Sequence, residues 1–446
     1  MRPYAIAVLL VGLGLASVLL WSARPPDAGA VWRGVFVLGH VLSLVGLVVA
    51  LRRWTPSMRE VLLVAVCLRV ALIPMMPTLS DDGYRYIWDG IVVIEAGLSP
   101  YALLPSDEHL AFLHVEPVYQ LMNSREYFSV YPPVAQSVFV VSALVHRTLG
   151  WKWSWYLLKG VIVLAELAGL VLIARAVRPE RLAWYALNPL VIVETAGQGH
   201  LEGIVVLGLG LVVFGMHRTG ARRLVGLSAG MVVATLTKLI PAGTASVVAR
   251  RTGWAGVAAM SSFALAWSIW FWVPGAVQNV GASVGLFLGT LDQYALPYRV
   301  LKAAIYPLTD SAGQIASAFL VSGWAASQLA AFAVDDGSYR AALRTLVVVV
   351  VGSLVVTSTL HPWYFVPALF VLTLSDDLRL RRAVFWLSAW SSVTYLGYTI
   401  PWTGDVAMLI GWLGAVVLYV WTHVQGTASR TRSTVATRAS SQTEVG

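Results

Sequence analysis

The chain has 446 residues, of which 58% are hydrophobic and 12% are charged. This composition excludes an ordinary soluble domain, because repeated apolar runs of about 20 residues predict helices that cross a bilayer core of about 30 Å. The net charge of +9 does not predict nucleic-acid binding, since its arginines lie mostly in short loops and in the C-terminal stretch. The single cysteine, Cys67, excludes a disulfide framework and a thiolate metal site.

The first part of the chain predicts three membrane spans, with the N-terminus on the cytoplasmic side. The N-terminal segment Met1–Leu20, which holds most of the first span, is expected to be retained rather than cleaved as a signal, because few basic residues precede its apolar run. Three arginines follow the second span, so the loop that holds them should be cytoplasmic. The spans are 4–21, 31–51 and 60–77, and the arginines are Arg52, Arg53 and Arg59.

The polar segment that follows, 78–131, is the longest in the chain and should therefore lie outside. Its residues 83–97 place apolar side chains at helical spacing opposite charged ones, which predicts an amphipathic helix on the outer membrane surface. The segment opens on Asp81 and Asp82, where a membrane helix should meet water. Carboxylates are costly to place there, and the simplest role for the pair is a hydrated helix end.

The remaining runs predict further spans and a second outer segment, 274–311. The basic clusters at 175–181 and 217–223 come out on the outer side if every run between 133 and 273 crosses once. Either the run 223–249 is two half-helices and a neighbouring run fails to cross, or both clusters break the positive-inside rule. The predicted ranges are 133–149, 155–174, 182–197, 202–217, 223–249, 252–273, 312–334, 340–358, 361–375, 381–400 and 405–423.

The sequence thus predicts an all-α polytopic membrane protein with about 12–14 transmembrane helices. We expect one transmembrane domain over residues 1–424. Residues 425–446 are rich in Ser, Thr and Arg and lack apolar periodicity, which predicts a disordered cytoplasmic tail.

The polar residues of the outer side suit transfer of a group from an anionic, lipid-linked donor. An acceptor hydroxyl needs a general base, which Asp81 or Asp82 can supply, and their like charges would raise the pKa of one of them. A donor phosphate needs cations or hydrogen-bond donors. The candidates for this role are Arg85, His200, Lys238, Arg299, Lys302 and His361.

Each candidate also has a structural interpretation. Arg85 and Lys302 can extend along the membrane surface with their charges in water. His200 lies in the polar break Gly197–Glu202, which can equally be a helix-capping turn. Lys238 favours a function, because an ammonium inside a strongly apolar run is costly without one.

Several short motifs follow one another in a specific order. They are Asp81-Asp82-x-Tyr84-Arg85-Tyr86-x-Trp88-Asp89-Gly90, Gly97-Leu98-Ser99-Pro100-Tyr101, Tyr131-Pro132-Pro133, Asn188-Pro189-Leu190 with Glu194 and Gly199-His200, and His361-Pro362-Trp363-Tyr364. The series, from about residue 60 to 375, resembles the GT-C glycosyltransferases. It is most similar to the bacterial polyprenol-phosphate-mannose-dependent mannosyltransferases.

This resemblance implies a GT-C-like fold with a large first outer loop that carries amphipathic helices. It also implies an inverting, metal-independent transfer of a sugar, expected to be mannose, from a polyprenyl-phosphate donor to an extracytoplasmic glycolipid or glycan. The base would be Asp81 or Asp82, which the resemblance does not separate. Aromatic residues would stack on sugar faces and lipid, among them Tyr84, Trp88, Tyr131 and Tyr364.

The implied partners are the donor, the acceptor and membrane lipids, without nucleic acid and without a cofactor beyond the donor. The implied location is the plasma membrane, with the active site on the extracytoplasmic face. The chain departs from the family pattern in two places. Two apolar runs precede the span that leads to Asp81, and the segment 107–127, where an acceptor would be held, matches no family segment.

Two other classes of function are considered. A transporter or flippase of lipid-linked sugars would need ionisable residues inside the spans and an internal repeat, whereas Lys238 and Glu166 are the only strong intramembrane charges that the sequence indicates. A glycan ligase or polymerase with a pyrophosphate-linked donor would need more cations in the large outer loop than Arg85 and Arg125.

Overall fold

The computed structural model describes residues 11–12, 14–16, 30–53, 55–269, 272–290, 292–398 and 400–443. Within these ranges the secondary structure is helical, with isolated β-bridges from Gln293 and Tyr294 to Thr359 and no longer strand. The all-helical prediction is therefore confirmed. The span predicted over 4–21 lies mostly outside the described residues.

Several helices are long and apolar enough to cross a membrane. Four of the described helices meet this condition, and Pro189–Gly197 together with Glu202–Met216 forms a fifth, bent by 112°. These helices confirm the coarse prediction of a helical, membrane-type chain, while the larger count of spans stays a prediction. The four are Trp151–Ile173, Ala312–Ala333, Tyr339–Val356 and Trp402–Gln425.

The helices follow one another along the chain with short connections. The elements before residue 200 are α2 (Ala30–Arg53), α3 (Met58–Leu72), α4 (Asp82–Ile91), the π-helix η1 (Val92–Ala96), the 3₁₀-helix η2 (Glu108–Leu113), α5 (Pro117–Leu121), α6 (Pro133–Ala143), α7 (His146–Leu149), α8 (Trp151–Ile173), α9 (Pro179–Ala186), α10 (Pro189–Ile192) and the π-helix η3 (Val193–Gly197). Those after it are α11 (Glu202–Met216), α12 (Gly220–Thr235), the 3₁₀-helix η4 (Ile240–Thr244), α13 (Ala245–Ser268), α14 (Ala276–Thr290), α15 (Leu296–Ile305), α16 (Ala312–Ala333), α17 (Tyr339–Val350), α18 (Ser353–Val356), the 3₁₀-helix η5 (Pro362–Tyr364), α19 (Phe365–Leu374), α20 (Leu378–Val393), the 3₁₀-helix η6 (Thr394–Tyr398) and α21 (Pro401–Thr443).

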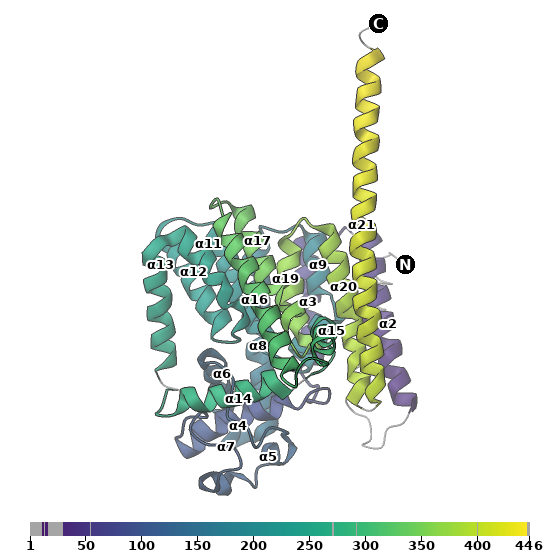
Figure 1. Ribbon diagram of the computed structural model, residues 1–446. Helices are drawn as coiled ribbons and strands as arrows, with labels where there is room; N and C mark the ends of the chain where they lie inside the picture. The colour runs from purple at the N-terminus through teal and green to yellow at the C-terminus, as the bar shows by residue number, and fades with distance from the viewer. Residues whose placement is uncertain are drawn as a thin grey trace.

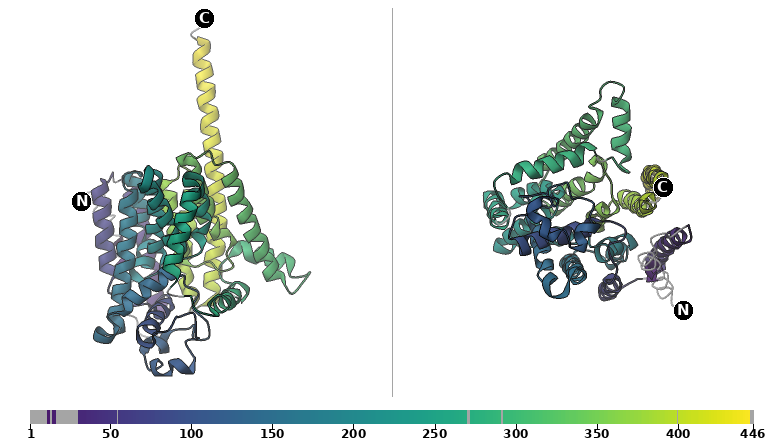
Figure 2. Two further views of the ribbon diagram at one scale, coloured as in Figure 1. Left: turned by 90° about the vertical axis from the view of Figure 1, so that its left-hand side faces the viewer. Right: turned by 90° about the horizontal axis from the view of Figure 1, so that it is seen from below.

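The bundle has two distinct ends. At one end, called the loop face here, α4, α5, α7 and α14 gather beneath the long helices (Figure 1). The predicted outer segments 78–131 and 274–311 meet there, because the Asn279 side-chain amide of α14 donates to the Tyr101 carbonyl at 2.8 Å. The end of α21 projects from the opposite end, called the basic face (Figure 2).

The two basic clusters that did not fit the predicted topology both lie at the basic face. Arg181 forms an ion pair with Asp376, next to the arginines at the start of α20, at 2.7 Å. His217 packs its ring against Tyr339, at the start of α17, with 4.6 Å between centroids. Both clusters therefore share a face with the loops that the sequence placed in the cytoplasm.

The structure agrees in part with the first of the two predicted alternatives, although the run that stays at one face, 133–149, is not the chain neighbour of 223–249. The run 223–249 divides, because α12 ends at Thr235 and a turn and η4 separate it from α13. The run 133–149 does not cross: the Val134 amide, at the start of α6, donates to the Leu236 carbonyl at 2.9 Å. Beyond α6, Arg147 of α7 pairs with Glu95 of η1 at 2.6 Å, so the whole run stays at the loop face.

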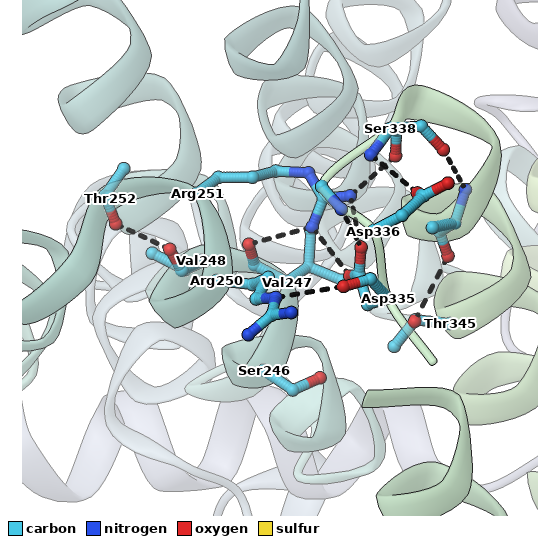
Figure 3. A network of polar contacts seen from close by, with 12 residues as sticks. Ser246, Val247, Val248, Arg250, Arg251, Thr252, Asp335, Asp336, Ser338 and Thr345 are labelled. Carbon is cyan, nitrogen blue, oxygen red and sulfur yellow. Dashed lines mark hydrogen bonds and ion pairs between the residues drawn. The ribbon is translucent and has the colours of Figure 1, made fainter. Parts of the chain in front are cut away.

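A polar network fixes the turn of α13 at the basic face. The Arg251 guanidinium pairs with the Asp335 carboxylate at 2.9 Å and also donates to the Ser338 carbonyl at 2.7 Å (Figure 3). The Arg250 side chain donates to the backbone carbonyl of Asp335 at 3.0 Å. Just beyond, Gly253 has φ +58°, a conformation that glycine adopts readily, and α13 bends there.

The helix predicted over 83–97 is present as α4 and η1, but it is buried rather than laid on the surface. Its polar face is covered by the chain that follows residue 123. Arg85 donates to the carbonyls of Ser124 and Tyr127, at 2.8 and 2.9 Å. Asp89 pairs with Arg85 at 2.7 Å and accepts a hydrogen bond from the Ser129 hydroxyl. These bonds satisfy the polar side chains that the sequence analysis assigned to water.

The C-terminal stretch predicted to be a disordered tail is described as helix up to Thr443. α21 continues as one helix to Thr443 and projects beyond the bundle (Figure 1). A helix that projects in this way rests on local backbone hydrogen bonds and on its intrinsic propensity, both of which are weak in water. Disorder of residues 425–446 in solution stays a prediction.

Candidate functional site

Two non-helical turns meet at the loop face. One, residues 73–81, joins α3 to α4 and is called the Asp82 turn here because it leads into Asp82. The other, residues 198–201, joins η3 to α11 and is called the His200 turn. The Gln198 side-chain carbonyl accepts from the backbone amides of Thr78 and Leu79, at 3.1 and 2.8 Å. Residues about 120 positions apart are thereby held together.

The structure places the two adjacent aspartates differently. Asp81 is exposed at the N-cap position of α4, without a side-chain capping bond, whereas Asp82 is partly buried in the first turn. Burial raises the pKa of Asp82 to about 6; the positive charge of Lys238 opposes this shift, and the negative charges of Glu202 and Asp81 add to it. Burial also raises the pKa of Asp81. Of the two aspartates, Asp82 is therefore the one whose pKa depends on the charges of Lys238 and Glu202.

Lys238 pairs with a carboxylate that the sequence analysis did not select. Its ammonium lies 2.5 Å from Glu202, the first residue of α11, and 5.4 Å from the centroid of the Tyr364 ring. Glu202 is buried, and within the described part of the chain its second oxygen, Oε2, has no hydrogen-bond partner. Lys238 lies in the turn after α12, so the charge occupies a break between helices rather than the middle of one.

A narrow cleft lies beside this ion pair. The space open to the centre of a water molecule is only about 20 Å³, within about 330 Å³ of unfilled volume that includes the part open to the exterior. Its polar lining comes from Glu202, Lys238, Ser353 and Tyr364. Its other walls are apolar and are formed by Val205, Ile240, Pro241, Val350 and Pro367. One end of the cleft is thus charged, and its other walls suit contact with a hydrocarbon chain.

The two candidate histidines pack against one indole. The ring centroids of His200 and His361 lie 4.0 and 4.3 Å from that of Trp363. His200 Nδ1 lies 2.8 Å from Glu194, whose two oxygens also accept from the Tyr395 hydroxyl at 2.9 Å. His200 Nε2 and His361 Nδ1 are buried and find no hydrogen-bond partner among the residues that the structure describes. A ligand could reach either nitrogen only if the packing around it opened.

Arg299 and Lys302, also predicted to bind phosphate, form a separate group. Arg299 pairs with Asp292 at 2.7 Å and with Asp405 at 2.5 Å, and Lys302 pairs with Asp292 at 2.8 Å. Two cations thus face two carboxylates, and the group has no net charge. A phosphate would have to displace these carboxylates to bind there.

The aromatic residues predicted to stack on the sugar have mainly structural contacts. Trp88 is 1% exposed and packs against Tyr119, at 5.1 Å between centroids, so it is covered by the segment 107–127. Tyr84 and Tyr131 are partly buried. Arg85 is committed to Asp89 and the loop carbonyls described above. The unmatched segment 107–127 therefore folds over α4 as a cover.

Sequence reasoning counted too few charges inside the apolar helices. Arg69 of α3 forms a bidentate pair with Glu166 of α8, at 2.6 and 2.8 Å, and Tyr185 donates to the same carboxylate at 2.9 Å. Glu194 and Glu202 are buried as well. The sequence signal available for Glu202 was its position at the end of the polar break Gly197–Glu202, which also holds His200. Arg69 lies inside the predicted span 60–77, so its charge was visible in the sequence, whereas its partner, 97 positions away, was not.

The arrangement brings together the partly buried carboxylate of Asp82, the Lys238–Glu202 ion pair and the imidazoles of His200 and His361, near a cleft with apolar walls. Within the described ranges, no group of three or more His, Cys, Asp or Glu could hold a metal ion. A scan against protein-family models, a search of curated proteins and a search of solved structures each found no match to the chain.

Proposed function

We propose that this chain is an inverting glycosyltransferase that moves a sugar, mannose by resemblance, from a polyprenyl-phosphate donor to a glycolipid or glycan. In this proposal it has a GT-C-like arrangement of about 12–14 spans in the plasma membrane. Its site faces the extracytoplasmic side. The observation that carries the proposal is the partly buried Asp82, within electrostatic reach of the Lys238–Glu202 pair beside a cleft with apolar walls.

Asp82 is the proposed base. A general base works best when its pKa lies near the operating pH, and burial moves the pKa of Asp82 toward that range. Asp82 takes the proton of the acceptor hydroxyl while the hydroxyl oxygen attacks C1 of the sugar. The C1–O bond to the phosphate breaks with inversion, and the polyprenyl phosphate leaves with the bonding electrons.

Lys238 is the proposed partner of the leaving phosphate. An ammonium has three hydrogen-bond donors, and Glu202 accepts from one of them. The remaining donors can bind phosphate oxygens, while the apolar walls of the cleft accommodate the first part of the polyprenyl chain. His361 and His200 are the proposed contacts of the sugar or the phosphate, because each has a ring nitrogen without a hydrogen-bond partner among the described residues.

The test is a transfer assay on the purified protein in lipid, with polyprenyl-phospho-mannose and mixed membrane glycolipids, with and without a chelator. Asp82→Asn should abolish transfer and leave folding intact. Asp81→Asn is the matched control, because it removes the same charge one residue away at an exposed position, and most of the activity should remain. Full turnover by Asp82→Asn would refute the mechanism. Binding of the donor without transfer would point to another sugar or a missing acceptor.

A transporter of lipid-linked sugars is the second candidate, and one observation favours it. The apolar helices hold more ionisable residues than the sequence indicated, among them Arg69, Glu194 and Glu202. Arg69 and Glu194, however, are already bonded to other side chains. Movement of a labelled lipid-linked sugar across proteoliposome membranes, unaffected by Asp82→Asn and without a new glycosylated product, would favour transport over transfer.

A further inference from the structure

Lys159 is a fully buried cation on α8 that no part of the proposed chemistry uses. Its ammonium donates to three backbone carbonyls, those of Met75 at 2.5 Å, Leu72 at 3.2 Å and Gly197 at 3.3 Å. A buried ammonium is costly unless its hydrogen bonds are satisfied, and three acceptors match its three donors. The fold thus supplies one carbonyl acceptor for each of the three donors of the Lys159 ammonium.

The three carbonyls belong to the ends of two different helices. Leu72 ends α3, Met75 lies in the Asp82 turn, and Gly197 ends η3 just before the His200 turn. The last carbonyls of a helix have no intrahelical partners, and the negative end of the helix dipole favours a cation there. One ammonium therefore caps two interrupted helices and joins the turns that follow them.

Trp155, one helical turn before Lys159, contacts the same two turns. Its indole N–H donates to the Met75 carbonyl at 3.0 Å. A Cβ atom added to Gly83 would lie 2.5 Å from the indole ring, and one added to Gly199 would lie 2.8 Å from it. Gly199 also has φ +66°, which side chains rarely adopt. Gly83, in the first turn of α4, and Gly199, in the His200 turn, are therefore both needed for these segments to pack against this face of α8.

We propose that Lys159 is a positioning residue, which holds the Asp82 turn and the His200 turn at a fixed separation so that Asp82 stays beside the Lys238–Glu202 pair. The catalytic part of this inference rests on the proposed function, whereas the ordering of the Asp82 turn does not. Two of the three carbonyls that Lys159 binds, those of Leu72 and Met75, lie in the chain that leads to Asp82, so its effect should fall mainly on the base and less on donor binding.

The kinetic test uses Lys159→Met, which keeps an unbranched side chain of similar length and removes the ammonium. A displacement of the base by about 1 Å can cost about 100-fold in rate, so kcat per folded protein should fall by that order. KM for the donor should stay within about threefold, because Lys238 is untouched. Lys159→Arg, which retains a cation, should recover part of kcat. Wild-type kcat in folded Lys159→Met, or an equal loss through KM alone, would overturn the proposal.

A second measurement tests the ordering of the turn without any activity. The only cysteine, Cys67, is replaced by serine, and a spin label is attached to a cysteine at the exposed position 81. Lys159→Met should make the label at position 81 more mobile than it is with Lys159 present. A label at Val115, which is 81% exposed in the cover segment, is the control and should not change. An unchanged spectrum at position 81 would overturn the proposal.

The two measurements separate the possible failures. A wild-type protein that transfers nothing, but whose label at position 81 responds to Lys159→Met, refutes the proposed function and retains the positioning role. If Lys159→Met does not fold, Gln198→Leu removes the other link to the Asp82 turn without leaving an unpaired charge. That variant should also mobilise the label at position 81, and no change there would contradict the link between the two turns.

Discussion

The stability cost of an ionised Asp82 gives a prediction that can be worked out from the structure. Burial raises the pKa of this carboxyl from 3.8 to about 6. Because the pKa is raised in the folded protein, the carboxyl costs no stability below about pH 4, where it is protonated in both the folded and the unfolded state. The folded protein loses stability as the pH rises from about 4 through about 6, and the full cost remains above that range. A shift of about two units corresponds to roughly 3 kcal/mol at neutral pH, and partial exposure of the carboxyl lowers that figure.

Asp82→Asn should therefore stabilise the protein at pH 7.5 while it abolishes transfer. Thermal unfolding in nanodiscs, followed by the fluorescence of the 19 tryptophans, provides the assay. We expect the Tm of the variant to exceed that of the wild type by a few degrees at pH 7.5 and to match it near pH 4. Asp81→Asn, at the exposed position, should show a smaller difference.

Two results would refute this reasoning. One is a Tm for Asp82→Asn that lies below the wild-type value at pH 7.5, and the other is a difference that does not change with pH. In the transfer assay, the same titration should lower kcat as the pH falls through about 6, because only the ionised carboxylate accepts the proton. A rate that is constant between pH 5 and pH 7 would exclude Asp82 as the base.

Three further changes have expected outcomes. Glu166→Gln leaves the buried Arg69 guanidinium without its charge partner, at a cost of about 3–5 kcal/mol, so much less monodisperse protein should be recovered by size-exclusion chromatography; normal recovery would contradict the pair. Gly199→Ala should lower Tm by more than Gly97→Ala, because both have φ +66° but only Gly199 meets other atoms within 4 Å. Lys238→Met should raise the donor KM by about 10-fold to 100-fold, the usual value of a hydrogen bond to a charged group, and an unchanged KM would remove Lys238 from the site.

The sequence was sufficient where the signal is local. The helix over 83–97, the break around Lys238 and the position of the two outer segments follow from apolar periodicity, an isolated charge and the distribution of arginines. The polar break at Gly197–Glu202 was also visible, although Glu202 itself was not selected. These features depend on residues within a few turns of one another.

The remainder depends on contacts between distant parts of the chain. The apolar run 133–149 has the composition of a span, and composition alone does not distinguish burial against protein from burial in lipid. The structure shows burial against protein, because the run packs on α4. A Cβ atom added to Gly90 of α4 would lie 2.3 Å from the Phe139 carbonyl oxygen. The difference in pKa between Asp81 and Asp82 likewise depends first on burial of Asp82 and then on the charges of Lys238 and Glu202, which are more than 100 residues away.

The bond between Tyr395 and Glu194 has a consequence for the order of synthesis. The two residues are separated by 201 positions, and ribosomes add about 5–20 residues per second, so Glu194 is made about 10–40 s before its partner. During that interval its carboxylate lacks the hydroxyl that covers it in the finished protein. A chain that stops before Tyr395 therefore leaves this carboxylate with His200 as the remaining partner that the structure describes, at 2.8 Å.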